Sequence, residues 1–269
     1  MSRSTLLLVA LVVIAPAARA QVPADTVAVQ DNSFLIEEAY NQEAKVVQHI
    51  STLVKDPQSG LWTYTFTQEW PVRGQRNQFS YTMPIANQGS RSQTGIGDML
   101  LNYRLQVIGP GASRLAFAPR LSMILPTGRT SRGLGRGSLG LQMNLPVSIE
   151  LTRRLVSHSN AGFTWTPRAE NSVGNRASVT EFNAGQSFIW LATPTLNFML
   201  ETTYQTSRFV VAPGTSVEHK NAFVAPGIRR AFNFRSGLQI VPGVAIPFEF
   251  GDDRHDAVAL LYLSFEHPF

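Results

Sequence analysis

The sequence of 269 residues predicts an all-β fold, a transmembrane antiparallel β-barrel of about twelve strands that follows a cleaved signal peptide. Three observations predict this class. Apolar and polar residues alternate from about residue 44 to the end, the only long apolar run lies at the N-terminus, and the last alternating run ends on phenylalanine. Without the N-terminal run, no stretch of about 18 apolar residues remains that could cross a membrane as a helix. We therefore expect residues 44–269 to cross it with strands.

The composition alone resembles that of a soluble domain, because the mean hydropathy is −0.03 and only 15% of the residues are charged. Alternation explains this average, since apolar and polar residues on opposite faces of the same strands cancel in the sum. The chain has no cysteine. Disulfide frameworks, thiolate metal sites and cysteine nucleophiles are thereby excluded.

Residues 1–20 have the pattern of a secretory signal peptide. Arg3 precedes an apolar run over 6–14, and Ala18 and Ala20 place small residues before a cleavage site. Gln21 follows the site, so no cysteine is present there to accept a lipid. The remaining net charge, close to +3 from the +5 of the whole chain, is too small to indicate nucleic acid as a partner.

Residues 21–43 precede the alternating pattern and form a separate N-terminal segment. It contains the acids Glu37 and Glu38 among apolar neighbours. One hypothesis places it in the lumen as a plug or short helix whose acids pair with arginines such as Arg104 or Arg120. The alternative is a loosely ordered periplasmic extension.

The alternating runs are long. The clearest covers 139–151, with an apolar residue at every second position and no large apolar residue between them. Several runs reach about ten residues, which is longer than the five or six typical of soluble strands and matches a tilted strand that crosses a bilayer. A soluble sandwich also alternates and is the alternative, but its strands are shorter.

Breaks at Gly, Pro, Asn and Asp clusters divide the chain into twelve predicted strands, with ten or fourteen as the alternatives. An even number places both termini in the periplasm, with short periplasmic turns and longer external loops. The predicted strands are 44–54, 60–72, 77–86, 96–108, 113–126, 137–151, 155–166, 178–192, 194–205, 221–230, 236–250 and 257–269. The predicted long external loops are 87–95, 127–136, 167–177 and 206–220.

Charged residues on the polar face of these strands are expected to line the lumen and to set its selectivity. The candidates are Glu69, Asp98, Arg104, Arg120, Glu150 and Glu201. The alternative is that opposite charges pair and only fill the barrel. The predicted external loops also carry basic residues, which either contact lipopolysaccharide phosphates or are simply solvated. They are Arg91, Arg129, Arg132, Arg136, Arg168, Arg176, Arg208 and Lys220.

The last strand resembles the C-terminal signature by which outer-membrane barrels are recognised for assembly. Leu261, Leu263, Phe265 and Phe269 share one face, although His267 stands where an aromatic residue is often found. This resemblance implies the barrel-assembly machinery as a partner.

No catalytic, metal or cofactor site is predicted. Some outer-membrane barrels are lipid-modifying enzymes, and their phospholipase places histidine and serine two residues apart on one strand. Here His158 and Ser159 are adjacent, so they point to opposite faces. A serine on a neighbouring strand is an open alternative as the partner of His158. The other histidines do not have the spacing of metal ligands.

Three segments resemble a bacterial outer-membrane transporter family related to the MetA pathway of phenol degradation. They are 32–43, 64–71 and 119–128. The resemblance covers nearly all of the mature chain and implies a barrel in the outer membrane of a Gram-negative bacterium. It supplies no catalytic or substrate-binding residues.

The leading functional hypothesis is a monomeric, porin-like channel or transporter for passive passage of small solutes, hydrophobic or aromatic ones among them. A twelve-stranded barrel has a narrow lumen, since clear aqueous channels belong to barrels of 16 or more strands. Expected partners are outer-membrane lipid, lipopolysaccharide and the solute. The alternatives are a structural or adhesive barrel that acts through its external loops and, with less support, a lipid-modifying enzyme.

Overall fold

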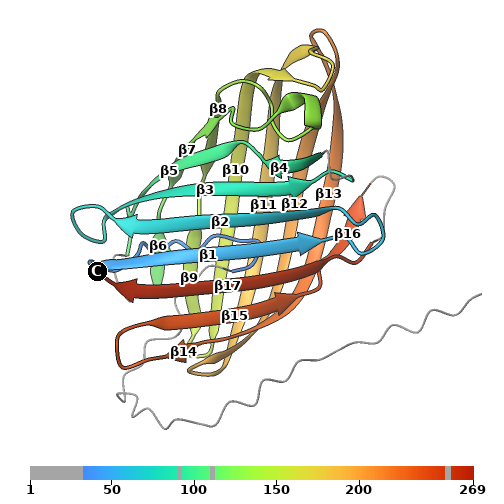
Figure 1. The fold of residues 1–269 in the computed structure, drawn as a ribbon. Coiled ribbons are helices and arrows are strands. Elements are labelled where there is room, and N and C mark those ends of the chain that lie inside the picture. The colour runs from blue at the N-terminus through green and yellow to red at the C-terminus, as the bar shows by residue number, and fades with distance from the viewer. Residues whose placement is uncertain (1–32, 90–92, 110–112, 252–255) are drawn as a thin grey trace, which may run out of the picture.

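The computed structural model describes residues 33–89, 93–109, 113–251 and 256–269, and its strands form one closed antiparallel barrel (Figure 1). The predicted signal peptide and residues 21–32 lie outside the described residues. The strands are β1 Val46–Lys55, β2 Trp62–Pro71, β3 Asn77–Asn87, β4 Thr94–Ile96, β5 Met99–Leu105, β6 Leu115–Phe117, β7 Arg120–Leu125, β8 Gly140–Asn144, β9 Val147–Thr152, β10 Leu155–Glu170, β11 Arg176–Thr193, β12 Leu196–Ala212, β13 Thr215–Arg230, β14 Phe232–Asn233, β15 Gln239–Ala245, β16 Phe248–Gly251 and β17 Ala259–Pro268.

The barrel closes between its first and last strands. β1 pairs with β17 over its full length, from Val46 opposite Pro268 to Lys55 opposite Ala259. Closure joins the two strands that would otherwise be the edges of the sheet. Four barrel strands consist of two segments each, namely β4–β5, β6–β7, β8–β9 and β15–β16, and the short β14 extends a turn beside β15. The prediction of a twelve-stranded barrel is therefore confirmed.

Proline explains three of the four interruptions. Pro119, Pro146 and Pro247 stand between the segments of their strands, where the missing N–H removes a donor from the ladder. The fourth interruption lies at Gly97 and Asp98. The sequence pattern crosses these positions without a break, because the side chains continue to alternate between the two faces.

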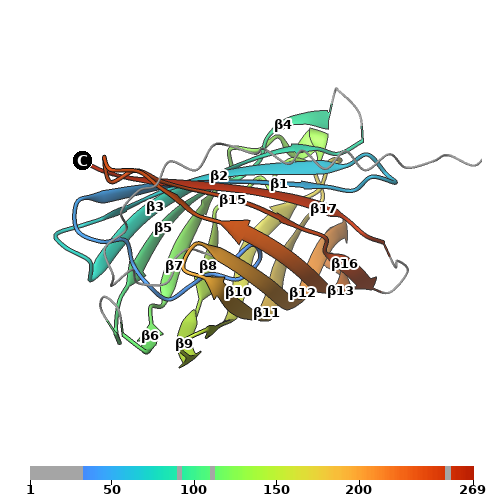
Figure 2. The same ribbon diagram turned by 90° about the horizontal axis from the view of Figure 1, so that it is seen from below.

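The outer surface of the barrel is apolar. Among its large exposed side chains are Leu121, Phe182, Trp190 and Leu261, each more than half exposed. Seen from below, β1, β2, β15 and β17 form one side of the barrel and β7 to β13 the other (Figure 2). Within the described ranges, no helix is long and apolar enough to span a membrane.

Two of the predicted external loops are wrong. Residues 167–170 continue β10, 176–177 begin β11, and β12 and β13 stay paired from Thr206 opposite Lys220 to Ala212 opposite Thr215. The two hairpins extend past the other strands (Figure 1). Ala169, Ala177 and Val210 of these extensions are buried together, but alanines and polar residues interrupt the run of large apolar side chains on which the prediction relied. Four basic residues expected in loops lie in strands instead, namely Arg168, Arg176, Arg208 and Lys220.

Candidate functional site

Residues 33–45, here called the strap, run through the lumen before β1 begins. The backbone N–H groups of alternate strap residues each donate to a polar side chain of the barrel wall. Leu35 donates to Glu201 Oε2 (3.0 Å), Glu37 to Asn160 Oδ1 (2.9 Å), Ala39 to Ser148 Oγ (2.7 Å) and Asn41 to Gln106 Oε1 (2.9 Å). Alternate residues of an extended chain face the same way, which is why one side of the strap is held.

The strap continues to β1 through glutamines. The N–H of Gln42 donates to Gln78 Oε1 at 2.7 Å, and its side-chain amide donates to Gln48 Oε1. The acceptors along the strap thus come from β12, β10, β9, the residue after β5, β3 and β1. Side chains of the wall satisfy backbone donors that would otherwise be satisfied by a sheet ladder.

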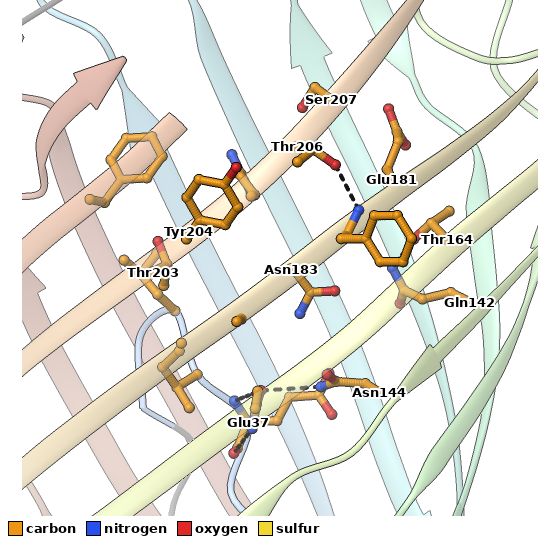
Figure 3. A pocket seen from close by; sticks show the side chains of 18 of the residues that line it. Glu37, Gln142, Asn144, Thr164, Glu181, Asn183, Thr203, Tyr204, Thr206 and Ser207 are labelled. Carbon is orange, nitrogen blue, oxygen red and sulfur yellow. Dashed lines mark hydrogen bonds between the residues drawn. The ribbon is translucent and has the colours of Figure 1, made fainter. Parts of the chain in front are cut away.

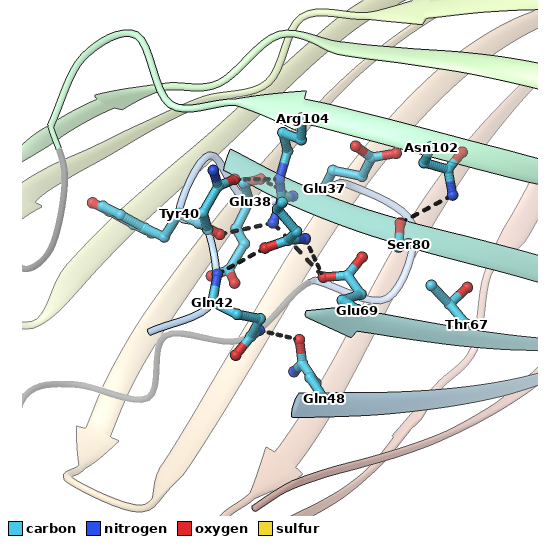
Figure 4. A network of polar contacts seen from close by, with 12 residues as sticks. Glu37, Glu38, Tyr40, Gln42, Gln48, Thr67, Glu69, Ser80, Asn102 and Arg104 are labelled. Atoms are coloured by element: carbon cyan, nitrogen blue, oxygen red, sulfur yellow. Dashed lines mark hydrogen bonds and ion pairs between the residues drawn. The ribbon is translucent and has the colours of Figure 1, made fainter. Parts of the chain in front are cut away.

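Arg104 on β5 clamps the middle of the strap (Figure 4). Its guanidinium donates to Asn41 Oδ1 (2.8 Å), to the carbonyl of Glu38 (3.0 Å) and to the carbonyl of Tyr40 (2.8 Å). The same group lies 3.7 Å from Glu69 Oε2 on β2, and only 3% of its side chain is exposed. A planar fork of donors suits this simultaneous contact with several oxygens.

Arg120 on β7 holds the strap through charge. It pairs with Glu37 at 2.5 Å and also donates to Asn102 Oδ1 (2.9 Å) and Gln142 Oε1 (3.0 Å). Burial favours the neutral form of Glu37, but the charges of Arg120 and Arg104 outweigh it. The pKa of this strap carboxyl therefore lies below its usual range.

An aromatic side chain anchors the N-terminal end of the strap. The Phe34 ring packs edge-on against Tyr262 of β17, with 5.3 Å between the centroids. It occupies space left by Gly227 of β13 and Gly243 of β15, where an added Cβ would lie 2.5 Å from the ring. Gly185 of β11 makes room for Ile36 in the same way. Three glycines of the wall are thus complementary to strap side chains.

His158 has a serine partner on the neighbouring strand. Its Nδ1 lies 2.7 Å from Ser148 Oγ on β9. Ser148 Oγ also accepts the N–H of Ala39, so this hydroxyl links His158 to the strap. Both side chains are buried beneath the strap. The contact supports the strap, and sequence spacing alone did not indicate it.

The strap brings four of the six predicted lumen residues together. Glu69 and Arg104 contact each other, Arg120 pairs with Glu37, and Glu201 accepts from Leu35. Neutral partners such as Asn160 were missed, because amides and hydroxyls are common on every polar strand face.

Asp98 and Glu150 lie elsewhere. Asp98, in the break between β4 and β5, accepts the N–H groups of Gly128 (2.9 Å) and Arg136 (2.6 Å) and so fixes the external loop 126–139. The Arg136 side chain then reaches Glu181 of β11 at 2.6 Å. Glu150 is on β9, two residues before that strand ends toward the turn at 153–154. Among the described residues, neither carboxylate forms a hydrogen bond or an ion pair with the strap.

Two cavities lie beside the strap and share some of their lining residues. One of about 470 Å³ extends along β8, β10, β11 and β12 (Figure 3), and one of about 240 Å³ faces β2, β3 and β5. Leu35, Ile36, Glu37 and Arg120 line both. Among the described residues, no group of three or more His, Asp or Glu side chains could hold a metal ion.

Comparison with solved structures identifies the fold. An outer membrane channel of the COG4313 group from Pseudomonas putida F1 superposes with a TM-score of 0.68 and 10% identity, over 86% of this chain and 98% of that chain. The NanC porin gives a TM-score of 0.54 and 7% identity, over 82% of this chain and 100% of that chain.

No family model and no curated protein matches the sequence. The resemblance to the MetA-related family therefore stays a prediction. What the comparisons establish is the architecture, which is that of outer-membrane barrels.

Proposed function

We propose that this chain is an outer-membrane channel of a Gram-negative bacterium through which small solutes pass passively. The observation that carries this proposal is a closed barrel with an apolar outer surface and a polar lumen that a single segment, the strap, crosses. This arrangement is the one expected of a barrel whose outer wall meets lipid and whose interior is wet. The names of the two similar structures, a channel and a porin, support it.

The strap is the plug of this channel. Its contacts reach from β1 and β3 to β12, and Phe34 extends them to β13, β15 and β17. The acceptors on β3, β9, β10 and β12 lie in the half of each strand nearer the end at which β1 begins and β17 ends, which we take as the periplasmic end. Solute passage therefore requires the strap to shift, with lumen charges such as Arg104 and Arg120 as its holding points.

Conductance across planar bilayers and liposome swelling test the proposal on purified, refolded protein. Wild type is expected to pass small solutes slowly, and deletion of residues 33–43 is expected to raise the flux at least tenfold. Heat-modifiable gel mobility checks that the deletion variant still folds. Absence of solute passage in both folded proteins would contradict the channel.

Lipid and assembly partners belong to the same proposal. The apolar outer surface contacts the membrane, and external arginines such as Arg129 and Arg132 contact lipopolysaccharide phosphates. The assembly machinery recognises β17 together with Phe269, which follows it. The contact between Ser148 and His158 favours one other candidate, a lipid hydrolase. Hydrolysis of phospholipid that is lost in both Ser148→Ala and His158→Ala would support that candidate instead.

A further inference from the structure

The larger cavity has the size of a small-molecule site. Its volume of about 470 Å³ lies within the range of about 300–1,000 Å³ found for ligand pockets. It begins at strap residues Leu35 to Glu37 and continues along β11 and β12 to Glu181 and Ser207 (Figure 3). A solute that enters from the external end meets this cavity before it meets the strap.

One wall of the cavity offers hydrogen-bonding groups that are not in use. Asn183 of β11 is directly opposite Gln205 of β12, and Thr203 follows on the same face of β12 opposite Gly185. Within the part of the chain that the structure describes, none of these three side chains makes a hydrogen bond. This contrasts with Asn160, the amide beneath the strap, which bonds Glu37 through both its oxygen and its nitrogen.

The cavity also has apolar lining residues. Phe223 of β13 lies beside the polar group, because it is the cross-strand partner of Thr203. Val54 of β1, Val258 before β17 and Leu35 of the strap line the cavity as well. An aromatic ring such as that of Phe223 packs well against a flat carbon face. The cavity therefore offers amides and hydroxyls next to hydrocarbon surface.

The charges at the cavity are already neutralised. Glu37 pairs with Arg120, and Glu181 pairs with Arg136 at 2.6 Å. Glu37, Arg120 and Glu181 are the only carboxylate or guanidinium side chains among the described residues that line the cavity. A charged solute would enter without a free counter-charge, which is costly in a desolvated site.

We propose that this cavity binds uncharged, polyhydroxylated ring compounds of pyranose size. Their hydroxyl groups would meet Asn183, Thr203 and Gln205, and their carbon face would meet Phe223. A ring with one hydroxyl group would leave most of the polar wall unpaired, and a purely apolar solute would leave all of it unpaired. The inference rests on the proposed channel function, for which it names the solute class, and it is an alternative to the expectation of hydrophobic or aromatic solutes.

Binding is measured without transport, by saturation-transfer NMR on the refolded full chain in detergent. The probes are a neutral methyl glucopyranoside, glucuronate as its charged counterpart, and phenol as a ring with one hydroxyl group. We expect the pyranoside to bind at least tenfold more tightly than either of the other two. Equal or tighter binding of phenol or glucuronate would overturn the proposal.

Asn183→Leu removes the hydrogen-bonding groups at nearly constant shape and is expected to weaken pyranoside binding about tenfold, the effect of one hydrogen bond of about 1.4 kcal/mol. The control is Asn233→Leu at the periplasmic turn, where the amide contacts Gln239, and binding there should stay within twofold. Unchanged binding in folded Asn183→Leu would overturn the site. Solute flux without pyranoside binding contradicts the site alone, whereas binding without any flux contradicts only the channel.

Discussion

The two halves of the lumen use the same kinds of side chain in opposite ways. Under the strap, the amides and carboxylates of Asn160, Gln106 and Glu201 accept backbone N–H groups from a chain that crosses the barrel. Toward the external end, Asn183 and Gln205 face a cavity and bond no described residue. Polar wall residues therefore hold a built-in segment in one half and are available to a solute in the other.

Polar residues in the lumen therefore do not by themselves show which part of it a solute contacts. A buried polar group stabilises a protein only when it is paired, and the pairing partner decides its role. In the strap half the partner is the chain itself. Substitutions in the strap half are therefore expected to lower the free energy of unfolding more than substitutions in the cavity half.

The largest effect is expected for Arg104→Met. The substitution removes three hydrogen bonds to the strap and the charge beside Glu69, and breaking such a buried pair costs about 3–5 kcal/mol. Equilibrium unfolding in urea measures the loss. Gln205→Met, in the cavity half, is the comparison and should change the free energy of unfolding by less than about 0.5 kcal/mol. Similar losses in the two variants would remove the distinction between the halves.

A matched pair of asparagines gives an intermediate effect. Asn160→Ala leaves the N–H and carbonyl of Glu37 without their partners, which costs about 1–3 kcal/mol. Asn183→Ala on the adjacent strand removes no hydrogen bond between described residues, and we expect almost no loss of stability. Amide hydrogen exchange adds a local measure, since only Asn160→Ala should speed exchange at Glu37. Slow exchange there in both variants would argue that the strap is held in some other way.

The smallest effect concerns pH. The pKa of Glu37 is lowered, so its pair with Arg120 contributes at neutral pH and is lost only as the pH falls below the usual value of 4.5. Both side chains are partly exposed, which limits the contribution to about 1 kcal/mol. We expect conductance to stay constant from pH 7 to pH 5 and to rise modestly at lower pH. Glu37→Gln should lack this rise, and a rise already at pH 6 would assign the effect to another group.

The sequence predicts the barrel well because strand alternation is local. Every second residue from Leu139 to Leu151 is apolar, and each of the twelve predicted strands corresponds to a strand of the structure. The extensions of the β10 to β13 hairpins escaped prediction, because the residues buried there include the small Ala169 and Ala177, which do not stand out as an apolar run. Strand length there depends on pairing, such as that of Phe209 with Val217, which periodicity does not report.

The site is less predictable than the fold. Glu69, Arg104, Arg120 and Glu201 stand out because charges on strand faces are rare, and the acids of the N-terminal segment indicate arginine partners. The neutral partners do not stand out: Glu37 meets Asn160 across 123 residues of sequence, and Ala39 meets Ser148 across 109. Such partners depend on barrel closure and register, which no local pattern encodes.

The central claim, that the strap must shift for solutes to pass, is tested most directly by a reversible lock. Ser33 of the strap donates to Ser187 of β11 with 2.9 Å between the hydroxyl oxygens, and the chain has no cysteine to compete. Side chains in such contact are near the Cβ separation of about 3.5–4.5 Å that a disulfide requires. Ser33→Cys with Ser187→Cys is expected to abolish liposome swelling when oxidised and to regain wild-type rates on reduction. Equal swelling rates of the oxidised and reduced protein would contradict the claim.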